Sequence, residues 1–416
     1  MNNKKILIVG SISNILEWYD YSLFGHLVVL LGSKFFPSSD ARIAALYGFL
    51  VFGLGFIARP AGGVIWGIIG DKFGRKIALR FSVMCMAIPT FVVGVLPTYQ
   101  NIGITATVVM IATRMLQGFA MGGALTSSIS FLIEHTPEKN KGLIGSIPIS
   151  SICLGVLLSS GVLSLTKFCL TSQQFNEFGW RIPFLLGIVL IFLSHYIKTN
   201  TIETPVFQSN LKHNEIPSSP VKEVFNLHKT KILSAIGLNA TGSILFYLQA
   251  VYLGNYLKIE KGIDEKVVDI MINSSYFLMF FVVLFAGYIS SIFGRKKFYI
   301  YLLSLISILT PSIMYGIENT DSVLYLSIFI SILTVLSGSY IAAEPAFMTE
   351  LYDSKTLNTA MAISYGIATA LFGGATPYIL NFMYTKFNTI TSFTYYILVS
   401  SALGLVSVLV ASRSRL

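Results

Sequence analysis

The sequence has little charge and almost no cysteine. Charged residues make up 12% of the 416 residues, about half of the ~25% that is usual in soluble globular domains. Three cysteines, Cys85, Cys153 and Cys169, stand at unrelated spacings, which argues against a disulfide framework and a zinc site. No metal-ligand cluster, nucleophile elbow or glycine-rich phosphate loop occurs in register. We therefore expect no enzymatic activity, no metal and no cofactor.

Acidic residues are the scarcer charged type, with 19 Asp and Glu against 29 Lys and Arg, which gives a formal net charge of +10. A strongly basic chain can indicate nucleic-acid binding. Here, however, the basic residues sit in short clusters beside apolar runs, where the topology of a membrane protein places them. Nucleic acid is therefore not an expected partner.

Hydrophobic residues are abundant, at 54% of the chain, and the mean hydropathy is +0.72. They form successive apolar runs of about 20 residues, which is the length that crosses a bilayer as a helix. The pattern predicts an all-α polytopic membrane protein with twelve transmembrane helices, embedded in the lipid bilayer. The predicted spans are 6–31, 44–69, 78–97, 102–133, 143–166, 182–198, 231–255, 267–291, 298–316, 322–343, 358–381 and 391–411.

A long polar segment divides the chain into two halves of six helices. The prediction is an N-terminal bundle over 1–198, a cytoplasmic linker over 199–230 and a C-terminal bundle over 231–416. Lysine and arginine are concentrated on the side that holds the linker and both chain ends. By the positive-inside rule, both termini are predicted to be cytoplasmic.

An internal repeat supports the same division. The stretch "GIIGDKFGRK" at 67–76 recurs 220 residues later as "GYISSIFGRK" at 287–296. Each copy follows the second span of its half. Two halves repeated in the same orientation form the architecture of one large class of transporters and predict a central cavity between the halves.

Several motifs resemble those of the major facilitator superfamily. The turn at 67–76 is similar to its loop signature, "RMLQGFAMGG" at 114–123 to its fourth-helix signature, and "IETP" at 202–205 to its acid-Ser/Thr-Pro motif. Three further stretches resemble the metabolite:proton symporter family: "NILEWYDYSLFG" at 14–25, "ARPAGGVIWGIIGDKFGRK" at 58–76 and "GWRIPFLLG" at 179–187.

The resemblance implies the major facilitator fold and a proton-coupled symporter of the bacterial inner membrane. We expect the protein to act as a monomer. Members of that family move small solutes such as proline and betaine, 2-oxoglutarate, shikimate and citrate. At residue 124, however, Ala124 stands where the family usually has Glu, so a buried acid is missing.

Two carboxylates inside the first apolar run are candidates for proton coupling. Glu17 and Asp20 are three residues apart and share a helix face. A charge at mid-membrane costs about 2.5–3.5 kcal/mol on insertion scales, so we expect both to face the protein interior or water. They then bind a cationic group or take up a proton; the alternative is a structural pair or cap.

Arg59 and Arg114 are the expected counter-charges and the expected ligands of a substrate carboxylate, because a guanidinium stays protonated and binds carboxylates through two hydrogen bonds. Gln117 shares the helix face of Arg114 and is a further candidate for substrate binding. Packing at a helix irregularity beside Pro60 is the alternative role for Arg59. Gly118 and Gly122 form a small-residue stripe for close helix contact.

Aromatic and second-half candidates complete the predicted site. Trp18 and Tyr21 are predicted to hold an ammonium group by cation-π attraction, with ordinary aromatic packing as the alternative. The remaining candidates lie in the seventh, tenth and eleventh spans: Tyr247, Gln249 and Tyr365 for the substrate, and Glu344 for the proton.

The repeated turn is the predicted gate. Its residues are Gly67, Asp71, Gly74, Arg75 and Lys76, with Arg295 in the second copy. The glycines permit a tight turn, and Asp71 is expected to pair with a basic group or a helix N-terminus of the other half. Positive-inside anchoring is the alternative role for Arg75 and Lys76. Since Ser291 replaces the acid in the second copy, the gate is predicted to be asymmetric.

Residues of both signs favour a zwitterion such as proline or a betaine over a dicarboxylate, for which surplus positive charge is expected. The predicted partners are therefore a small-molecule substrate and protons. A proton symporter of an organic acid is the alternative. A transporter-like receptor that binds a solute without moving it is a third hypothesis.

Overall fold

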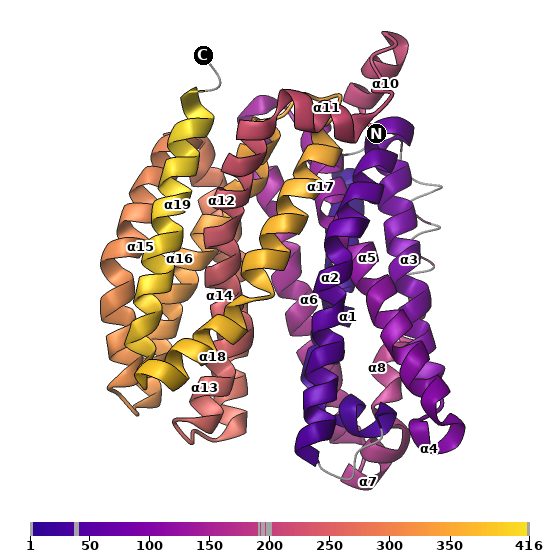
Figure 1. Cartoon of the computed structure of the whole chain (residues 1–416), viewed down its shortest axis with the longest axis vertical. Coiled ribbons are helices and arrows are strands. Elements are labelled where there is room, and N and C mark those ends of the chain that lie inside the picture. Colours follow the sequence, from indigo (N-terminus) through magenta and orange to yellow (C-terminus); the bar gives the residue numbers. More distant parts are fainter. Residues whose placement is uncertain (1–2, 37–40, 190–191, 193–195, 197–201, 414–416) are drawn as a thin grey trace. The chain divides into compact units, whose positions relative to one another are not determined.

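The computed structural model describes residues 3–36, 41–189, 192, 196 and 202–413, and all regular elements in these ranges are helices (Figure 1). The long helices are α1 (Asn3–Phe35), α2 (Ala41–Phe73), α3 (Arg75–Val95), α5 (Ile104–Glu134), α6 (Lys141–Cys169), α12 (Lys229–Tyr247), α14 (Glu265–Phe293), α15 (Arg295–Glu318), α16 (Val323–Thr349) and α19 (Phe393–Arg413).

Shorter elements connect or extend the long helices. The α-helical ones are α4 (Tyr99–Ile102), α7 (Ser172–Gln174), α8 (Arg181–Leu185), α10 (Pro205–Lys212), α11 (Pro220–Leu227), α13 (Gly254–Ile259), α17 (Leu357–Ala368) and α18 (Thr376–Phe387). The 3₁₀ turns are η1 (Glu138–Asn140) and η5 (Ile390–Ser392). The π-helical segments are η2 (Phe175–Gly179), η3 (Leu248–Leu253) and η4 (Thr369–Gly373).

Ten helical segments within the described residues are long and apolar enough to cross a membrane. Each corresponds to one of the twelve predicted spans. The predicted span 6–31 lies on α1, a helix of 33 residues that carries Glu17 and Asp20 and is not among the ten. The predicted span 182–198 lies partly outside the described residues. The cytoplasmic position of the termini stays a prediction.

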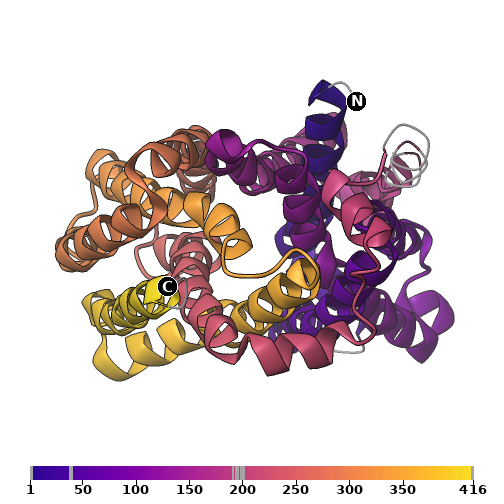
Figure 2. The ribbon, with the colours of Figure 1, turned by 90° about the horizontal axis from the view of Figure 1, so that it is seen from above.

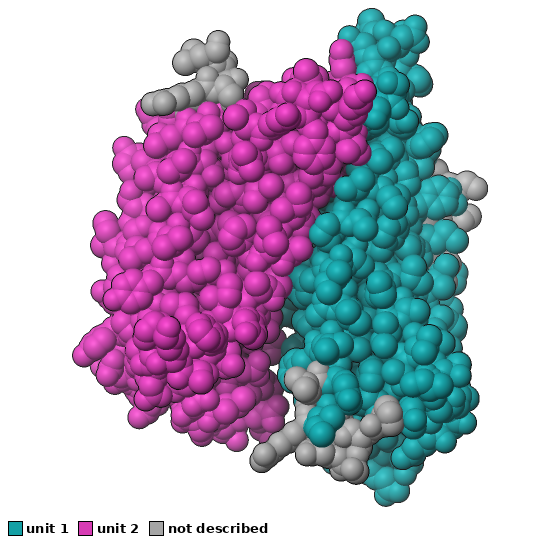
Figure 3. Space-filling view, viewed as in Figure 1, with its two compact units in different colours: residues 1–135, 151–220 teal, residues 136–150, 221–416 magenta. Residues whose placement is uncertain are grey.

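The chain forms two compact units, coloured separately in Figure 3. Unit 1 comprises residues 1–135 and 151–220, and unit 2 comprises residues 136–150 and 221–416. The chain changes unit at three places, and one of them, between Ser150 and Ser151, falls inside α6. The segment predicted as a linker contains the eight-residue helices α10 and α11.

In unit 1, helices α2 and α5 approach each other closely along glycines. A Cβ atom at Gly118 would overlap the backbone of Gly55, and one at Gly62 would overlap the backbone of Phe119. Gly122 is packed in the same way against the backbone of α2. The predicted small-residue stripe on α5 is therefore confirmed, because only glycine leaves room for this helix contact.

An aromatic core fills one end of unit 1. Trp180 and Phe35 are fully buried, and their rings meet edge to face with centroids 5.8 Å apart. The hydroxyl of Tyr19 donates to the carbonyl of Pro183 at 2.9 Å. These contacts fix α1 against the segment around α8.

In unit 2, tyrosines connect helices α12, α15 and α16, which are seen roughly end-on in Figure 2. Tyr340 and Tyr299 are fully buried. The Tyr340 hydroxyl donates to the Leu238 carbonyl at 2.8 Å, and the Tyr299 hydroxyl donates to the Tyr340 carbonyl at 3.2 Å. These bonds leave the hydroxyls satisfied in an apolar interior.

Candidate functional site

A buried ion pair joins α1 to α5 in unit 1. An oxygen of Asp20 lies 3.8 Å from Nη1 of Arg114, and the two side chains are 0% and 3% exposed. The Arg114 guanidinium also lies over the ring of Phe24, with Cζ 3.4 Å from the centroid. The structure thus brings one predicted acid against one predicted counter-charge, as a buried charge requires.

Gln117 extends this pair to a third helix. Its Nε2 donates to Oδ2 of Asp20 at 2.8 Å and to the hydroxyl of Thr90 on α3 at 3.0 Å. The oxygen of Asp20 that faces Arg114 therefore also accepts a hydrogen bond from an amide. Thr90 was not a predicted site residue; a threonine within an apolar run is too common to single out.

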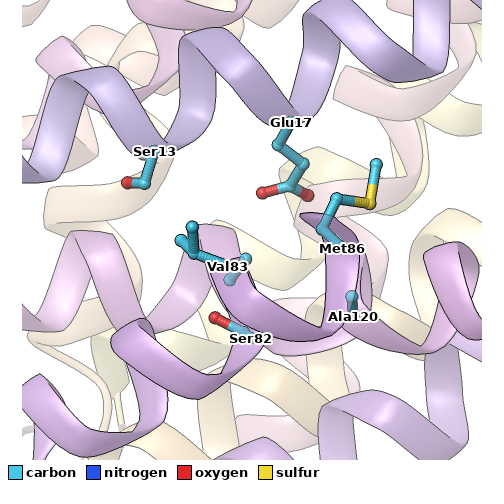
Figure 4. Close-up of a pocket in the computed structure, with 7 residues that line it drawn as sticks. Ser13, Glu17, Ser82, Val83, Met86 and Ala120 are labelled. Atoms are coloured by element: carbon cyan, nitrogen blue, oxygen red, sulfur yellow. The ribbon is translucent and has the colours of Figure 1, made fainter. Parts of the chain in front are cut away.

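Glu17 lines a separate small pocket between α1, α3 and α5 (Figure 4). Its carboxylate points from α1 toward Met86 and Val83 of α3 (Figure 4). The other lining residues are Ser13, Ser82, Ala120 and Ala124. Glu17 is 5% exposed, and its Oε2 has no hydrogen-bond partner among the described residues.

Arg59 is surrounded by aromatic rings. Its Cζ lies 4.8 Å from the ring centroid of Tyr21 and 4.5 Å from that of Phe56, and Nη2 lies 3.3 Å from Sδ of Met121. Trp18 meets Tyr21 edge to face, with ring centroids 5.4 Å apart. The ring of Tyr21, predicted to hold a substrate cation, here holds the guanidinium of Arg59.

In unit 2, two of the candidates stand at π-helical segments, which often occur at functional sites. Gln249 belongs to η3, and its Nε2 donates to the hydroxyls of Ser275 at 3.1 Å and Thr334 at 2.5 Å. Tyr247 is buried against Gly373 of η4. Tyr365 lies half-buried on α17.

Glu344 is buried on α16, with 5% of its surface exposed. Its Oε1 has no hydrogen-bond partner among the described residues. Pro345 follows it inside the helix. No metal site accompanies the acids, since no group of three or more His, Cys, Asp or Glu within the described part of the chain is placed to hold a metal ion.

The predicted gate turn is built around a buried arginine. Gly74 directly precedes α3. Its φ of +114° is a conformation that favours glycine. Arg75 is fully buried; its Nη1 lies 3.3 Å from Asp71, and its Nη2 lies 3.0 Å from Glu134 at the end of α5. Gly67 is buried on α2. Asp71 thus pairs within its own unit, and a contact with the other half stays a prediction.

Glu203 of the "IETP" motif caps the same helix start. Its carboxylate accepts from the backbone N–H of Arg75 at 3.0 Å and of Lys76 at 3.1 Å, where the helix dipole favours an anion. Burial raises the pKa of Glu203 above its usual value, although the bonds from Thr204 and Lys76 and the charge of Arg75 oppose the change.

Sequence reasoning missed Glu134 and the role of Glu203 in this network. Thr204 also donates to Glu134 at 2.5 Å, so the turn, the end of α5 and the motif after the sixth span meet. The signal available in the sequence was an acid directly after the fourth predicted span and another in the "IETP" motif.

The second copy of the turn repeats part of this arrangement. Gly294 has φ +80° and precedes α15, and Arg295 forms an ion pair with Glu350, just after α16. Ser291, at the position of Asp71, accepts a hydrogen bond from the backbone N–H of Gly142 at 3.1 Å. The second copy thus has a hydroxyl where the first has a carboxylate, and asymmetric gating stays a prediction.

A transporter family accounts for this combination of helices and buried charge. Residues 6–217, just over half of the chain, match the family model described as "Sugar (and other) transporter". The chain therefore belongs to this family, within the major facilitator superfamily. It is a multi-pass membrane transporter, and the expectation that it is not an enzyme is confirmed.

Among its relatives, the chain is 28% identical over 415 residues to the "Proline/betaine transporter" of Salmonella typhimurium, covering 97% of this chain and 82% of the relative. It is 28% identical, again over 415 residues and with the same coverage, to the "Glycine betaine/proline/ectoine/pipecolic acid transporter OusA" of Dickeya dadantii. The recognised resemblance to proline and betaine transporters is confirmed.

The fold is that of a solved transporter. The proton:xylose symporter XylE, bound to 6-bromo-6-deoxy-D-glucose, superposes with a TM-score of 0.80 over 98% of this chain and 94% of XylE. The sequence identity is 15%, so this likeness concerns the fold alone. The predicted major facilitator fold is confirmed.

Proposed function

We propose that this transporter is a proton-coupled symporter that imports a small zwitterionic osmolyte, such as proline or a betaine, across the bacterial plasma membrane by alternating access. The observation that carries the proposal is the buried set of both charge signs in unit 1: Glu17, Asp20, Arg59 and Arg114. Relatives named for proline and betaine transport support the substrate class.

A zwitterion suits this set because each end finds an opposite charge. Its carboxylate is bound by Arg59 or Arg114 through charge-assisted hydrogen bonds. Its ammonium group is held by an acid of α1 and by the aromatic residues Trp18 and Tyr21. Tyr247, Gln249 and Tyr365 of unit 2 remain candidates for substrate contact, and the turns at Asp71 and Arg295 for gating.

An organic acid is the second candidate, and the two buried arginines favour it. With Glu17 and Asp20 both ionised, however, the four buried groups carry no net charge, which disfavours a dicarboxylate with its two negative charges. The expectation of a monomer stays a prediction.

Uptake by purified protein in liposomes tests the proposal. Labelled proline and glycine betaine are supplied with and without an imposed pH gradient, acidic outside. With one proton per solute, a gradient of about one pH unit drives about tenfold accumulation. A protonophore abolishes this accumulation, and protein-free liposomes provide the control.

Accumulation that is indifferent to the gradient contradicts symport. Uptake of 2-oxoglutarate or citrate, with neither proline nor betaine transported or competing, contradicts the zwitterion and supports the organic acid. Binding of a solute without any flux supports the receptor hypothesis instead.

A further inference from the structure

The two acids of α1 have different surroundings in the structure. Oδ2 of Asp20 faces Arg114 at 3.8 Å and accepts a hydrogen bond from Gln117 at 2.8 Å. Oε2 of Glu17 is buried and has no hydrogen-bond partner among the described residues. Oδ1 of Asp20 is also without a bond, but its carboxylate as a whole has a cation and a donor. Asp20, with a cation and a hydrogen-bond donor in contact, is thus better equipped than Glu17 to stay ionised.

The hydroxyls that line the pocket of Glu17 have backbone acceptors of their own. The Ser82 hydroxyl donates to the carbonyl of Leu79 at 3.0 Å, and the Ser13 hydroxyl lies 3.4 Å from the carbonyl of Gly10. The rest of the lining is apolar, including Met86 and Val83. A carboxylate in such a place is costly as an anion and tolerable as a neutral acid.

Ala124 lines the same pocket from α5. This is the position at which the resemblance to related symporters leads us to expect a second acid. Because alanine stands there, the pocket holds Glu17 as its single carboxyl group. Whatever proton exchange occurs in this pocket must therefore use Glu17.

Resting on the proposed function, we propose that Glu17 takes up and releases the coupling proton, whereas Asp20 stays ionised as the partner of Arg114. The proton adds to a carboxylate oxygen of Glu17 from one side of the membrane and leaves to the other, with no other bond made or broken. Asp20 and Gln117 then position Arg114 for the substrate.

Other charged groups act on Glu17 from neighbouring elements. Arg59, from α2, favours its ionised form, and Asp20, on its own helix, favours its neutral form. Arg59 is held by the rings of Tyr21 and Phe56. A substrate carboxylate that engages Arg59 therefore weakens the attraction on Glu17 and favours protonation. Substrate and proton are expected to bind cooperatively for this reason.

Infrared difference spectroscopy of the purified protein tests the inference without any transport. We expect a protonated-carboxyl band that titrates with pH, is lost in Glu17→Gln and persists in Asp20→Asn and Glu344→Gln. Glu138→Gln, whose side chain is 72% exposed in the wild type, is the matched control. This readout is independent of the substrate, so failure of proline or betaine uptake does not affect it.

A second variant restores the acid from the opposite helix. In Glu17→Gln with Ala124→Glu, a carboxyl group enters the same pocket from α5, and we expect the band to return. In liposomes, Glu17→Gln should lose gradient-driven accumulation of labelled proline, from about tenfold to about onefold. The double variant should regain part of the accumulation.

The inference is overturned if the band and the accumulation survive in Glu17→Gln and disappear in Asp20→Asn or Glu344→Gln. If Glu17→Gln does not fold, labelling of the unmodified chain with a hydrophobic carbodiimide gives the same decision. This reagent attacks protonated carboxyl groups in apolar sites. Label at Glu17 supports the inference, and label at Asp20 or Glu344 alone contradicts it.

Discussion

At the scale of the residue, Arg75 shows how buried charge organises this protein. The side chain is fully buried, and it contacts Asp71, Glu134 and the carbonyl of Gly70, while its backbone N–H binds Glu203. A guanidinium suits this position because its several donors diverge in one plane. A buried charge without a partner is strongly destabilising, so the arginine and its acids depend on one another.

We expect Arg75→Ala to destabilise the protein by about 3–5 kcal/mol, because the substitution leaves buried acids without their cation. Thermal unfolding in detergent measures the effect. Lys72→Ala is the matched control, since it removes a partly exposed cation from the same turn. An unfolding temperature equal to that of Lys72→Ala contradicts the structural role of Arg75.

At the scale of the element, the contact between α2 and α5 depends on the absence of side chains. Trp66 of α2 adds a hydrogen bond across this contact, from Nε1 to the carbonyl of Phe119 at 3.0 Å. Close backbone approach gains van der Waals contact, the main attraction between helices that face lipid. This contact also keeps α2, which carries Arg59, next to α5, which carries Arg114.

We expect Gly118→Ala to cost about 1–3 kcal/mol, because the new methyl group overlaps the backbone at Gly55 and forces the helices apart. Gly53→Ala on α2 is the matched control, because a Cβ there has no atom within 4 Å. Replacing glycine by alanine in a helix stabilises by about 0.5–1 kcal/mol where space is available. Unfolding in detergent checks both expectations: the midpoint should fall in Gly118→Ala and rise in Gly53→Ala. Equal midpoints in the two variants refute the close contact.

At the scale of the whole molecule, the internal repeat places a similar ion pair in each unit. Arg75 pairs with Glu134 at the end of α5, and Arg295 pairs with Glu350 just after α16. In both units the pair connects the start of the third repeated helix to the end of the fourth. The first unit adds Asp71 and the second does not, because Ser291 replaces the acid.

Unfolding of the two units can be followed separately, since the three tryptophans, Trp18, Trp66 and Trp180, all belong to unit 1. We expect Arg295→Ala to lower the unfolding temperature measured by circular dichroism more than the one measured by tryptophan fluorescence. In Arg75→Ala, the unfolding temperature measured by fluorescence should fall more than the one measured by circular dichroism. Equal shifts of both signals in both variants contradict this expectation.

The sequence by itself determined the class of the protein. Apolar runs of membrane length, a polar central segment and a repeated turn predict helices and halves, because hydrophobicity and helix periodicity are local properties. Helix-face reasoning likewise grouped Arg114 with Gln117 and marked Gly118 and Gly122 as a contact stripe. The structure confirmed both the glycine contact and the predicted fold.

Only the tertiary structure decided how the buried charges are distributed. It paired Asp20 with Arg114 and left Glu17 in its own pocket, although the two acids are three residues apart. It also brought Glu134 and Glu203 to Arg75, across distances in sequence of 59 and 128 residues. Electrostatic partners depend on which helix faces meet, and these long-range contacts have no counterpart in local sequence patterns.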